Sequence, residues 1–205
     1  MHFRIRGKNM KALFLMPLAY SVYQFQLGAL SAYLKRHGHE VEYMEFILTG
    51  QFDRVSQDRL LNKLKTFSPD IVGFSSYELS FEWIMEMSTY VKPKIDAPII
   101  VGGYFATLKP DLVIAHPAID IVCVGEGERP LIELLERMEN NGDILDIKSL
   151  YIKKDGKVYK NKVGDLFENL DELPFIDRTL IDYQRHIGYP TGKHDAYLCV
   201  MASKG

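Results

Sequence analysis

The chain has 205 residues, of which 47% are hydrophobic and 25% charged, so it carries enough apolar side chains for a packed core and lacks the bias of disordered chains. Its 25 lysines and arginines face 27 acidic residues, which disfavours nucleic-acid binding because such proteins carry a basic excess. No segment is apolar over the length of a membrane span, so no membrane contact is expected. Cys123 and Cys199 lie far apart, without disulfide or metal-ligand spacing, which favours a reducing, cytoplasmic setting.

From Lys11 onward, short apolar runs alternate with segments of helical periodicity, which is typical of repeated βα units with a parallel sheet. Residues 1–10 precede this pattern and are interpreted as a leader. The runs that predict strands are 12–17, 40–46, 70–75, 98–101 and 120–124. We therefore predict a doubly wound α/β domain over residues 11–146, with a five-stranded parallel sheet in flavodoxin-like, Rossmann-like order.

The pattern changes after Asp146, and residues 147–205 are predicted to form a C-terminal β-hairpin and a linker. Two alternating segments, 150–154 and 157–162, flank Asp155-Gly156, a sequence typical of a tight hairpin turn. We expect this hairpin to be a ribbon appended to the domain. The acidic segment 166–183 predicts a linker along the surface, and an apolar run at 196–202 predicts a last strand, from which we expect a longer parent protein.

In an open parallel sheet, ligands bind beyond the carboxyl ends of the strands, where the connections reverse direction. Four loops meet this rule, namely 17–24, 75–78, 102–107 and 125–128. Their glycines allow a ligand to approach the backbone, and their hydroxyls form hydrogen bonds without charge. Glycine and serine are also ordinary turn formers, so the hypothesis of a site depends on the four loops together.

Known nucleotide-binding motifs do not fit these loops. Gly125-Glu126-Gly127 begins like G-x-G-x-x-G, but Pro130 stands at the third glycine position, and acidic side chains would face the pyrophosphate. No glycine-rich loop followed by Lys and a hydroxyl residue occurs either. A dinucleotide or ATP is therefore disfavoured.

Several side chains capable of chemistry have plainer interpretations. Glu128 stands where a helix is predicted to begin, and there it interacts favourably with the helix dipole. Cys123 lies in an apolar run and is interpreted as a small buried hydrophobe. His37, His39 and His116 stand at predicted helix ends, where a cation is favourable, and they lack the spacing of a zinc site. We expect no catalytic residue and no metal ligand among them.

The four loops in this order resemble the amino-terminal cobalamin-binding domain of B12-dependent radical S-adenosylmethionine (SAM) enzymes. The matching text is D-I-V-G-F-S-S at 70–76, I-I-V-G-G-Y-F-A-T-L-K-P-D at 99–111, V-G-E-G-E at 124–128 and L-D-E-L-P-F at 170–175. The resemblance covers about Lys11 to Gly205. It implies that the chain ends just before the C-x-x-x-C-x-x-C motif that opens the catalytic barrel in that family.

The resemblance implies a corrinoid held over the carboxyl edge of the sheet, with its nucleotide tail among the loops. By motif matching, the residues that would bind the cofactor are Leu18, Tyr20, Ser75, Ser76, Tyr77, Gly102, Gly103, Tyr104, Phe105, Thr107, Gly125, Glu126 and Gly127. The chain lacks D-x-H-x-x-G, so cobalt is expected without a histidine ligand (His-off). Many relatives read G-G-x-H-A-T where this chain has Phe105.

The implied function is to present cobalamin to a radical SAM barrel of the parent chain, plausibly in a methyltransferase. The parent would also use S-adenosylmethionine and a 4Fe–4S cluster, whose ligands are absent from these 205 residues, so the chain alone is not expected to be catalytic. Two alternatives stay open. One is a flavodoxin-like module that binds FMN or another small ligand, and the other is a cofactor-free docking domain, which Phe105 would suit.

Overall fold

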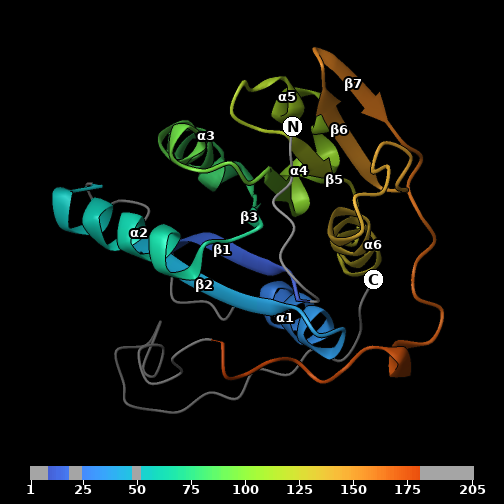
Figure 1. Ribbon diagram of the computed structural model, residues 1–205. Coiled ribbons are helices and arrows are strands. Elements are labelled where there is room, and N and C mark those ends of the chain that lie inside the picture. Colours follow the sequence, from blue (N-terminus) through green and yellow to red (C-terminus); the bar gives the residue numbers. More distant parts are fainter. Residues whose placement is uncertain (1–8, 19–24, 48–51, 181–205) are drawn as a thin grey trace.

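The computed structural model describes residues 9–18, 25–47 and 52–180, and its elements form an α/β domain (Figure 1). The strands are β1 (Lys11–Leu18), β2 (Glu40–Ile47), β3 (Ile71–Ser75), β4 (Ile99–Gly102), β5 (Ile121–Cys123), β6 (Leu150–Lys154) and β7 (Lys157–Lys160). The helices are α1 (Phe25–Arg36), α2 (Arg54–Phe67), α3 (Phe81–Val91), α4 (Tyr104–Leu108), α5 (Pro110–Ala115) and α6 (Glu128–Glu139). Short 3₁₀ turns are η1 (Glu78–Ser80), η2 (Lys92–Lys94) and η3 (Leu170–Glu172).

The described strands form one sheet in the order β2-β1-β3-β4-β5-β6-β7. Strands β1 to β5 are parallel, which confirms the predicted flavodoxin-like order 2-1-3-4-5. The prediction of five strands is wrong, because the sheet has seven. The hairpin is not a separate ribbon: β6 pairs antiparallel with β5, and Cys123 lies opposite Leu150.

The physical reason for the longer sheet is the apolar half of β6. Leu150 and Ile152 are buried and join the same core cluster as Cys123 and Ile121, so pairing with β5 removes both side chains from water. It also covers a three-residue strand that would otherwise be an open edge. The exposed strand β7, which begins and ends with lysine, becomes the outer edge, where charge opposes edge-to-edge pairing.

Helices cover both faces of the sheet, and the alternation of β1 shows how the faces divide. Ala12, Phe14 and Met16 pack in one cluster with residues of α1 and α6, while Leu13 and Leu15 pack in the other with residues of α2, α3 and α5. Successive strand residues point to opposite faces, so a strand buried on both sides is apolar at nearly every position. None of the helices in the described ranges combines the length and apolar character needed to cross a bilayer.

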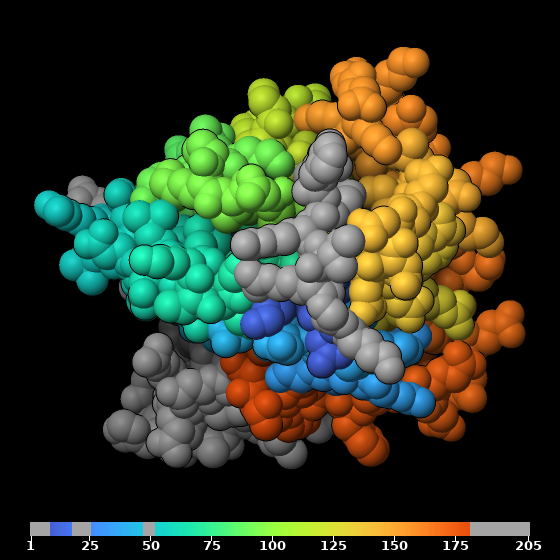
Figure 2. Space-filling model, viewed as in Figure 1, coloured from blue at the N-terminus to red at the C-terminus, as the bar shows by residue number. Residues whose placement is uncertain are grey.

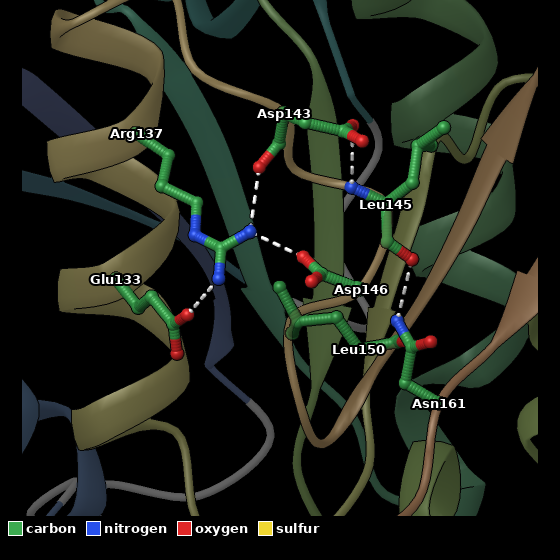
Figure 3. Close-up of polar contacts among 7 residues, drawn as sticks. All are labelled: Glu133, Arg137, Asp143, Leu145, Asp146, Leu150 and Asn161. Atoms are coloured by element: carbon green, nitrogen blue, oxygen red, sulfur yellow. Dashed lines mark hydrogen bonds and ion pairs between the residues drawn. The ribbon is translucent and has the colours of Figure 1, made fainter.

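The segment between α6 and β6 is fastened by polar contacts (Figure 3). Arg137 pairs with Glu133 one turn earlier and with Asp146, and it also donates to the Asp143 carbonyl oxygen at 2.6 Å. From the opposite side, the amide of Asn161 donates to the carbonyl oxygens of Leu145 and Leu150 at 2.9 and 3.0 Å. These bonds hold the antiparallel hairpin against the parallel part of the domain.

The described part of the predicted linker, residues 166–180, runs past α6 and along α1 (Figure 1). Its atoms lie directly against those of α1 in the space-filling view (Figure 2). Phe167 is buried and packs edge-on against Tyr33 of α1, with ring centroids 5.8 Å apart. The prediction that this segment packs along the surface is confirmed for these residues. The predicted strand at 196–202 lies outside the described residues.

Candidate functional site

The candidate site lies at the carboxyl ends of the parallel strands, where the connections from β1 and β3 lead in opposite directions. β1 lies between β2 and β3, so the switch point predicted for this fold falls between β1 and β3. The side chain of Leu18, the last residue of β1, and the whole of Tyr20 lie outside the described part of the chain. The site is therefore built here from the loops after β3, β4 and β5.

Ser76 ties the loop after β3 to the loop after β4. Its amide and its hydroxyl both donate to the Gly102 carbonyl oxygen at 2.8 Å. The same hydroxyl accepts the Ala106 amide at 3.0 Å, and the Ser76 carbonyl accepts the Phe105 amide at 3.0 Å. The side chain is fully buried. The hydroxyl of Ser76 therefore maintains the shape of the site, whereas the half-buried Ser75 is not used by this network.

Gly103 is the point of closest approach between these two loops. Its φ of 90° and ψ of −173° fall in a region that is essentially restricted to glycine. A Cβ at this position would lie 2.7 Å from the Ser76 nitrogen and 2.9 Å from the Ser75 hydroxyl oxygen. Gly102 differs, because a Cβ there would lie 3.6 Å from its nearest neighbour, Cys123. Of the predicted glycine pair, Gly103 is thus required by the fold, and Gly102 leaves space.

Thr107 links the loop after β4 to the loop after β5. Its hydroxyl donates to the Gly103 carbonyl oxygen at 3.0 Å and accepts the Gly125 amide at 3.0 Å. Gly125 has a φ of 86°, a backbone conformation that favours glycine. The hydroxyl predicted for ligand binding is thus engaged between the loops, and it brings Gly102–Gly103 and Gly125–Gly127 into one continuous edge.

Three of the four aromatic residues of the predicted site lie in the described part of the chain, each in different surroundings. Tyr104 is 72% exposed directly after Gly103, so its ring is available to a ligand above the edge. Phe105 is half-buried and packs on Phe81 with ring centroids 4.6 Å apart. The backbone of Tyr77 exchanges hydrogen bonds with Ser80 at the start of η1.

The loop after β5 forms the side of the edge. A Cβ on Gly127 would lie 3.8 Å from Leu30 of α1, and one on Gly125 would lie 3.5 Å from Val163. Leu30 and Val163 are neighbours that sequence reasoning missed, because they come from distant parts of the chain and belong to no motif. Beyond Val163, a cleft of about 210 Å³ opens between the start of α6 and residues 163–167.

The remaining reactive side chains are structural. Burial, with a smaller effect of the nearby Glu128 carboxylate, raises the pKa of Cys123 to about 12, so its thiol is neutral and a poor nucleophile. Glu128 is buried at the first position of α6, as predicted for a helix start. His39 corrects a prediction: burial lowers its pKa, and its Nδ1 accepts the Met10 amide at 3.3 Å, so it is a neutral acceptor and no helix-end cation.

The histidines of the described segments all lie at the opposite edge of the sheet. His37 and His39 directly precede β2, and His116 follows α5 and precedes β5, so the three stand at the amino ends of strands. In the described ranges, no group of three His, Cys, Asp or Glu side chains is placed to hold a metal ion. The carboxyl edge itself presents backbone, hydroxyls and Tyr104, with Glu126 as the charged side chain among the predicted residues.

This composition suits a large ligand that is recognised through neutral hydrogen bonds and through its flat faces. The glycine backbones leave room above β4 and β5, and the exposed ring of Tyr104 offers an apolar surface. A corrinoid, with amide side chains around a flat macrocycle, fits such an edge. A pyrophosphate fits poorly, because the predicted site residues contribute one carboxylate, that of Glu126, and no cation.

Comparison with known proteins also points to a corrinoid. The B12 binding domain family matches residues 15–135, which include every residue of the predicted site. An uncharacterized methyltransferase of Pyrococcus horikoshii is 27% identical over 97% of this chain and 44% of its own length. The cytidylyl-2-hydroxyethylphosphonate methyltransferase of Streptomyces wedmorensis is 26% identical over 91% of this chain and 35% of its own length. The chain thus spans about a third to a half of the length of these relatives.

A solved structure shares the fold. The radical S-adenosylmethionine methyltransferase TsrM from Kitasatospora setae, with cobalamin and a [4Fe–4S] cluster bound, superposes with a TM-score of 0.63 and 21% sequence identity. The superposition covers 78% of this chain and 30% of that one. The family predicted from the loop motifs is confirmed by the match over residues 15–135, and the chain belongs to the B12 binding domain family.

Proposed function

We propose that this chain holds a cobalamin over the carboxyl edge of β3, β4 and β5 and presents it to a radical SAM domain of a longer protein. The observation that carries the proposal is the continuous glycine-lined edge after β4 and β5, at the same end of the sheet as the switch point and inside the segment that matches the family. Residues 11–146 would be the binding unit, with β6 and β7 completing its sheet. Residues 147–205 would lead from it toward the downstream domain.

The proposed contacts follow the geometry of the edge. Ser75, with a hydroxyl outside the loop network, would bond the ligand directly, and Tyr104 would pack on it. The backbones of Gly102 and Gly125–Gly127 would line the path of the ligand. Ser76, Gly103 and Thr107 would act by holding the loops in place, since their hydrogen bonds and close contacts are internal.

The remaining predicted residues receive smaller roles. Tyr77 and Glu126 would form the walls of the site, and Phe105 would support α4 through its contact with Phe81. Leu18 and Tyr20, at and after the end of β1, would approach the macrocycle.

The cobalt is proposed to lack a histidine ligand from this chain. His37, His39 and His116 lie at the amino ends of strands, across the sheet from the proposed site. The loop sequences at the carboxyl edge contain no histidine. The His-off state predicted from the missing D-x-H-x-x-G motif is therefore kept as part of the proposal.

The parent reaction is proposed to be a radical SAM methyl transfer, in line with the names of the relatives. Cobalamin would supply the methyl group, while S-adenosylmethionine and the iron–sulfur cluster would belong to the downstream domain. This chain would position the cofactor and shield one of its faces, since the difficult chemistry is that of the cofactors. A cytoplasmic location stays a prediction of the sequence.

The test is a titration of the purified chain with hydroxocobalamin, followed by desalting and an absorption spectrum, with FMN as a parallel ligand. We expect retained corrinoid with a spectrum free of histidine ligation. Tyr104→Ala should weaken retention by up to about tenfold, the value of one aromatic contact. Leu79→Ala is the matched control, because Leu79 is 74% exposed on the neighbouring turn η1.

Each other outcome has a definite meaning. Retention of FMN with loss of corrinoid would support a flavodoxin-like module and refute the proposal. Loss of both ligands would favour the cofactor-free docking domain. A spectrum with a nitrogen ligand would overturn the His-off assignment while leaving cobalamin binding intact.

A further inference from the structure

Asp177, in the linker, makes the densest set of polar contacts between the linker and the helices. Its carboxylate accepts the Ser31 hydroxyl at 2.7 Å and the Lys35 ammonium at 2.6 Å, both on α1. It also accepts the amide and hydroxyl of Thr179 at 3.0 and 2.7 Å. The Asp177 amide donates to the Gly28 carbonyl oxygen at 3.0 Å. The side chain keeps only 8% of its surface exposed.

The hydrogen bonds of the Asp177 carboxylate lower its pKa by more than burial raises it. Burial by itself would raise the pKa of Asp177, but the hydrogen bonds from Lys35, Thr179 and Ser31 hold it well below its ordinary value. A carboxylate with several charge-assisted and neutral donors is a strong local anchor. The ion pair Arg129–Glu172, at 3.4 Å and about half exposed on both sides, is a weak one by comparison.

The contacts also define the direction of the linker along α1. Arg36, at the end of α1, donates to the Glu172 carbonyl oxygen at 2.9 Å, whereas Asp177 contacts Gly28 and Ser31 in the first half of the helix. Since α1 follows β1, its first half lies at the carboxyl edge of the sheet and its end at the amino edge. At Asp177 the linker therefore lies against the half of α1 that is nearer the carboxyl edge.

The part of α1 that Asp177 contacts is close to the candidate site. Leu30 lies between Gly28 and Ser31 on α1 and is the nearest neighbour of Gly127 in the loop after β5, at 3.8 Å from its Cβ position. Leu180, three residues after Asp177, packs against the core cluster that contains residues of α1 and α6. The last described residues thus lie on the side of α1 that is nearer the candidate site.

We propose that Asp177 is a positioning residue, which pins the linker to the first half of α1 so that the chain leaves the domain at the sheet edge of the candidate site. The inference rests on the proposed function in one respect: the benefit of this position is that a downstream domain would face the cofactor. The geometric claim itself concerns this chain alone: without the Asp177 carboxylate, the linker detaches while the sheet and the loops after β3, β4 and β5 keep their structure.

The first test is hydrogen–deuterium exchange of the 205-residue chain, comparing the wild type with Asp177→Asn. Peptides covering residues 172–180 should exchange at least about tenfold faster in the variant. The carboxylate bonds that must break before the linker opens in the wild type are absent from it. Peptides from β1 to β5 serve as an internal reference for intact folding. Asp171→Asn is the matched control, since Asp171 lies in the same linker with an exposed side chain. Lys35→Met should reproduce part of the effect.

The second test measures position with spin labels at Phe175→Cys and Leu79→Cys in a Cys199→Ser background. Phe175 is fully exposed and Leu79 is 74% exposed, and the native Cys123 is buried and protected by its raised pKa of about 12. We expect one narrow distance distribution in the parent and in Asp171→Asn, and a broad one in Asp177→Asn. Asp177→Glu, which keeps the charge, should restore part of the narrow component.

Two results would overturn the inference. One is exchange of residues 172–180 within about twofold of wild type in Asp177→Asn, and the other is an unchanged distance distribution despite faster exchange. Neither readout uses a cofactor, so a chain that fails to retain hydroxocobalamin would refute the proposed function and leave the role of Asp177 to these two measurements.

Discussion

The substitution Gly103→Ala tests the close approach on which the candidate site depends. The backbone at Gly103 has φ 90° and ψ −173°, a conformation that costs a residue with a side chain about 1–3 kcal/mol. The new Cβ would also lie 2.7 Å from the Ser76 nitrogen and 2.9 Å from its carbonyl oxygen. Relief of that contact strains the bonds of Ser76 to Gly102 and Phe105, worth about 0.5–1.5 kcal/mol each. Together these effects predict a loss of about 2–6 kcal/mol when both bonds are broken.

Gly156→Ala is the matched control. Gly156, in the turn between β6 and β7, also has a positive φ, 75°, but a Cβ there would meet nothing within 4 Å. It should cost about 1–2 kcal/mol for the backbone conformation alone. The assay is urea unfolding followed by circular dichroism at neutral pH, with the free energies of unfolding compared. If Gly103→Ala costs no more than Gly156→Ala, the loops after β3 and β4 do not approach as described, and the argument for this edge fails.

Three further predictions concern the same domain. Ser76→Ala should lower the free energy of unfolding by about 1–3 kcal/mol, because it leaves the buried Ala106 amide without its acceptor and removes one of the two hydrogen bonds to the Gly102 carbonyl oxygen, whereas Ser75→Ala should leave it within about 0.5 kcal/mol and weaken hydroxocobalamin retention instead. His39 has a lowered pKa when folded, so the unfolded chain binds its proton more readily, and stability should fall as pH drops below 6.5, by at most about 1.4 kcal/mol per pH unit. His39→Asn, which keeps an acceptor for the Met10 amide, should reduce that slope in urea titrations at pH 5 and 8. The Cys123 thiol, with its pKa of about 12, should react with a disulfide reagent at pH 8 only after unfolding; rapid reaction in the folded Cys199→Ser chain would contradict its burial.

The parallel core was predictable because its signal is local. β3 to β5 are apolar at nearly every position, and the predicted ranges of β1 to β5 differ from the observed ones by at most one residue at each end. The hairpin was recognised for the same reason, since Asp155 and Gly156 both have positive φ, at 50° and 75°, as a tight two-residue turn requires. Its place in the sheet was not predictable from the turn, because it depends on the buried contacts of Leu150 and Ile152 with the core.

Helix α4 and the range of helix α5 were not predicted, although His116 was expected at a helix end, and the reason is a different one. Each has five or six residues, too few for a periodic apolar pattern to emerge from the sequence. Their position comes from tertiary bonds, among them those of Ser76 to Ala106 and Phe105. A segment expected to be an open loop at 102–107 is therefore a helix start held against β3.

This difference changes the interpretation of the predicted site. The motifs placed Ser75, Ser76 and Thr107 together as hydroxyls for a ligand, since sequence shows residue type and order but not where a hydrogen bond is directed. In the structure, the hydroxyls of Ser76 and Thr107 form hydrogen bonds with the backbone of Gly102, Gly103, Ala106 and Gly125. A motif residue can thus serve the site by shaping it, and the glycine backbones, Ser75 and the exposed ring of Tyr104 are the groups proposed for direct contact.

The distribution of charge over the domain adds a last constraint on what this edge can do. The histidines of the described segments stand at the amino ends of strands, and the dense cationic and anionic contacts of Lys35 and Asp177 lie on the outer side of α1. Among the predicted site residues at the carboxyl edge only Glu126 is charged, so a ligand bound by them is held mainly by shape and by neutral hydrogen bonds. Affinity at such an edge depends on loop geometry, and this is why a methyl group added at Gly103 should affect both folding and binding, whereas removal of the Asp177 carboxylate should release the linker without altering the edge.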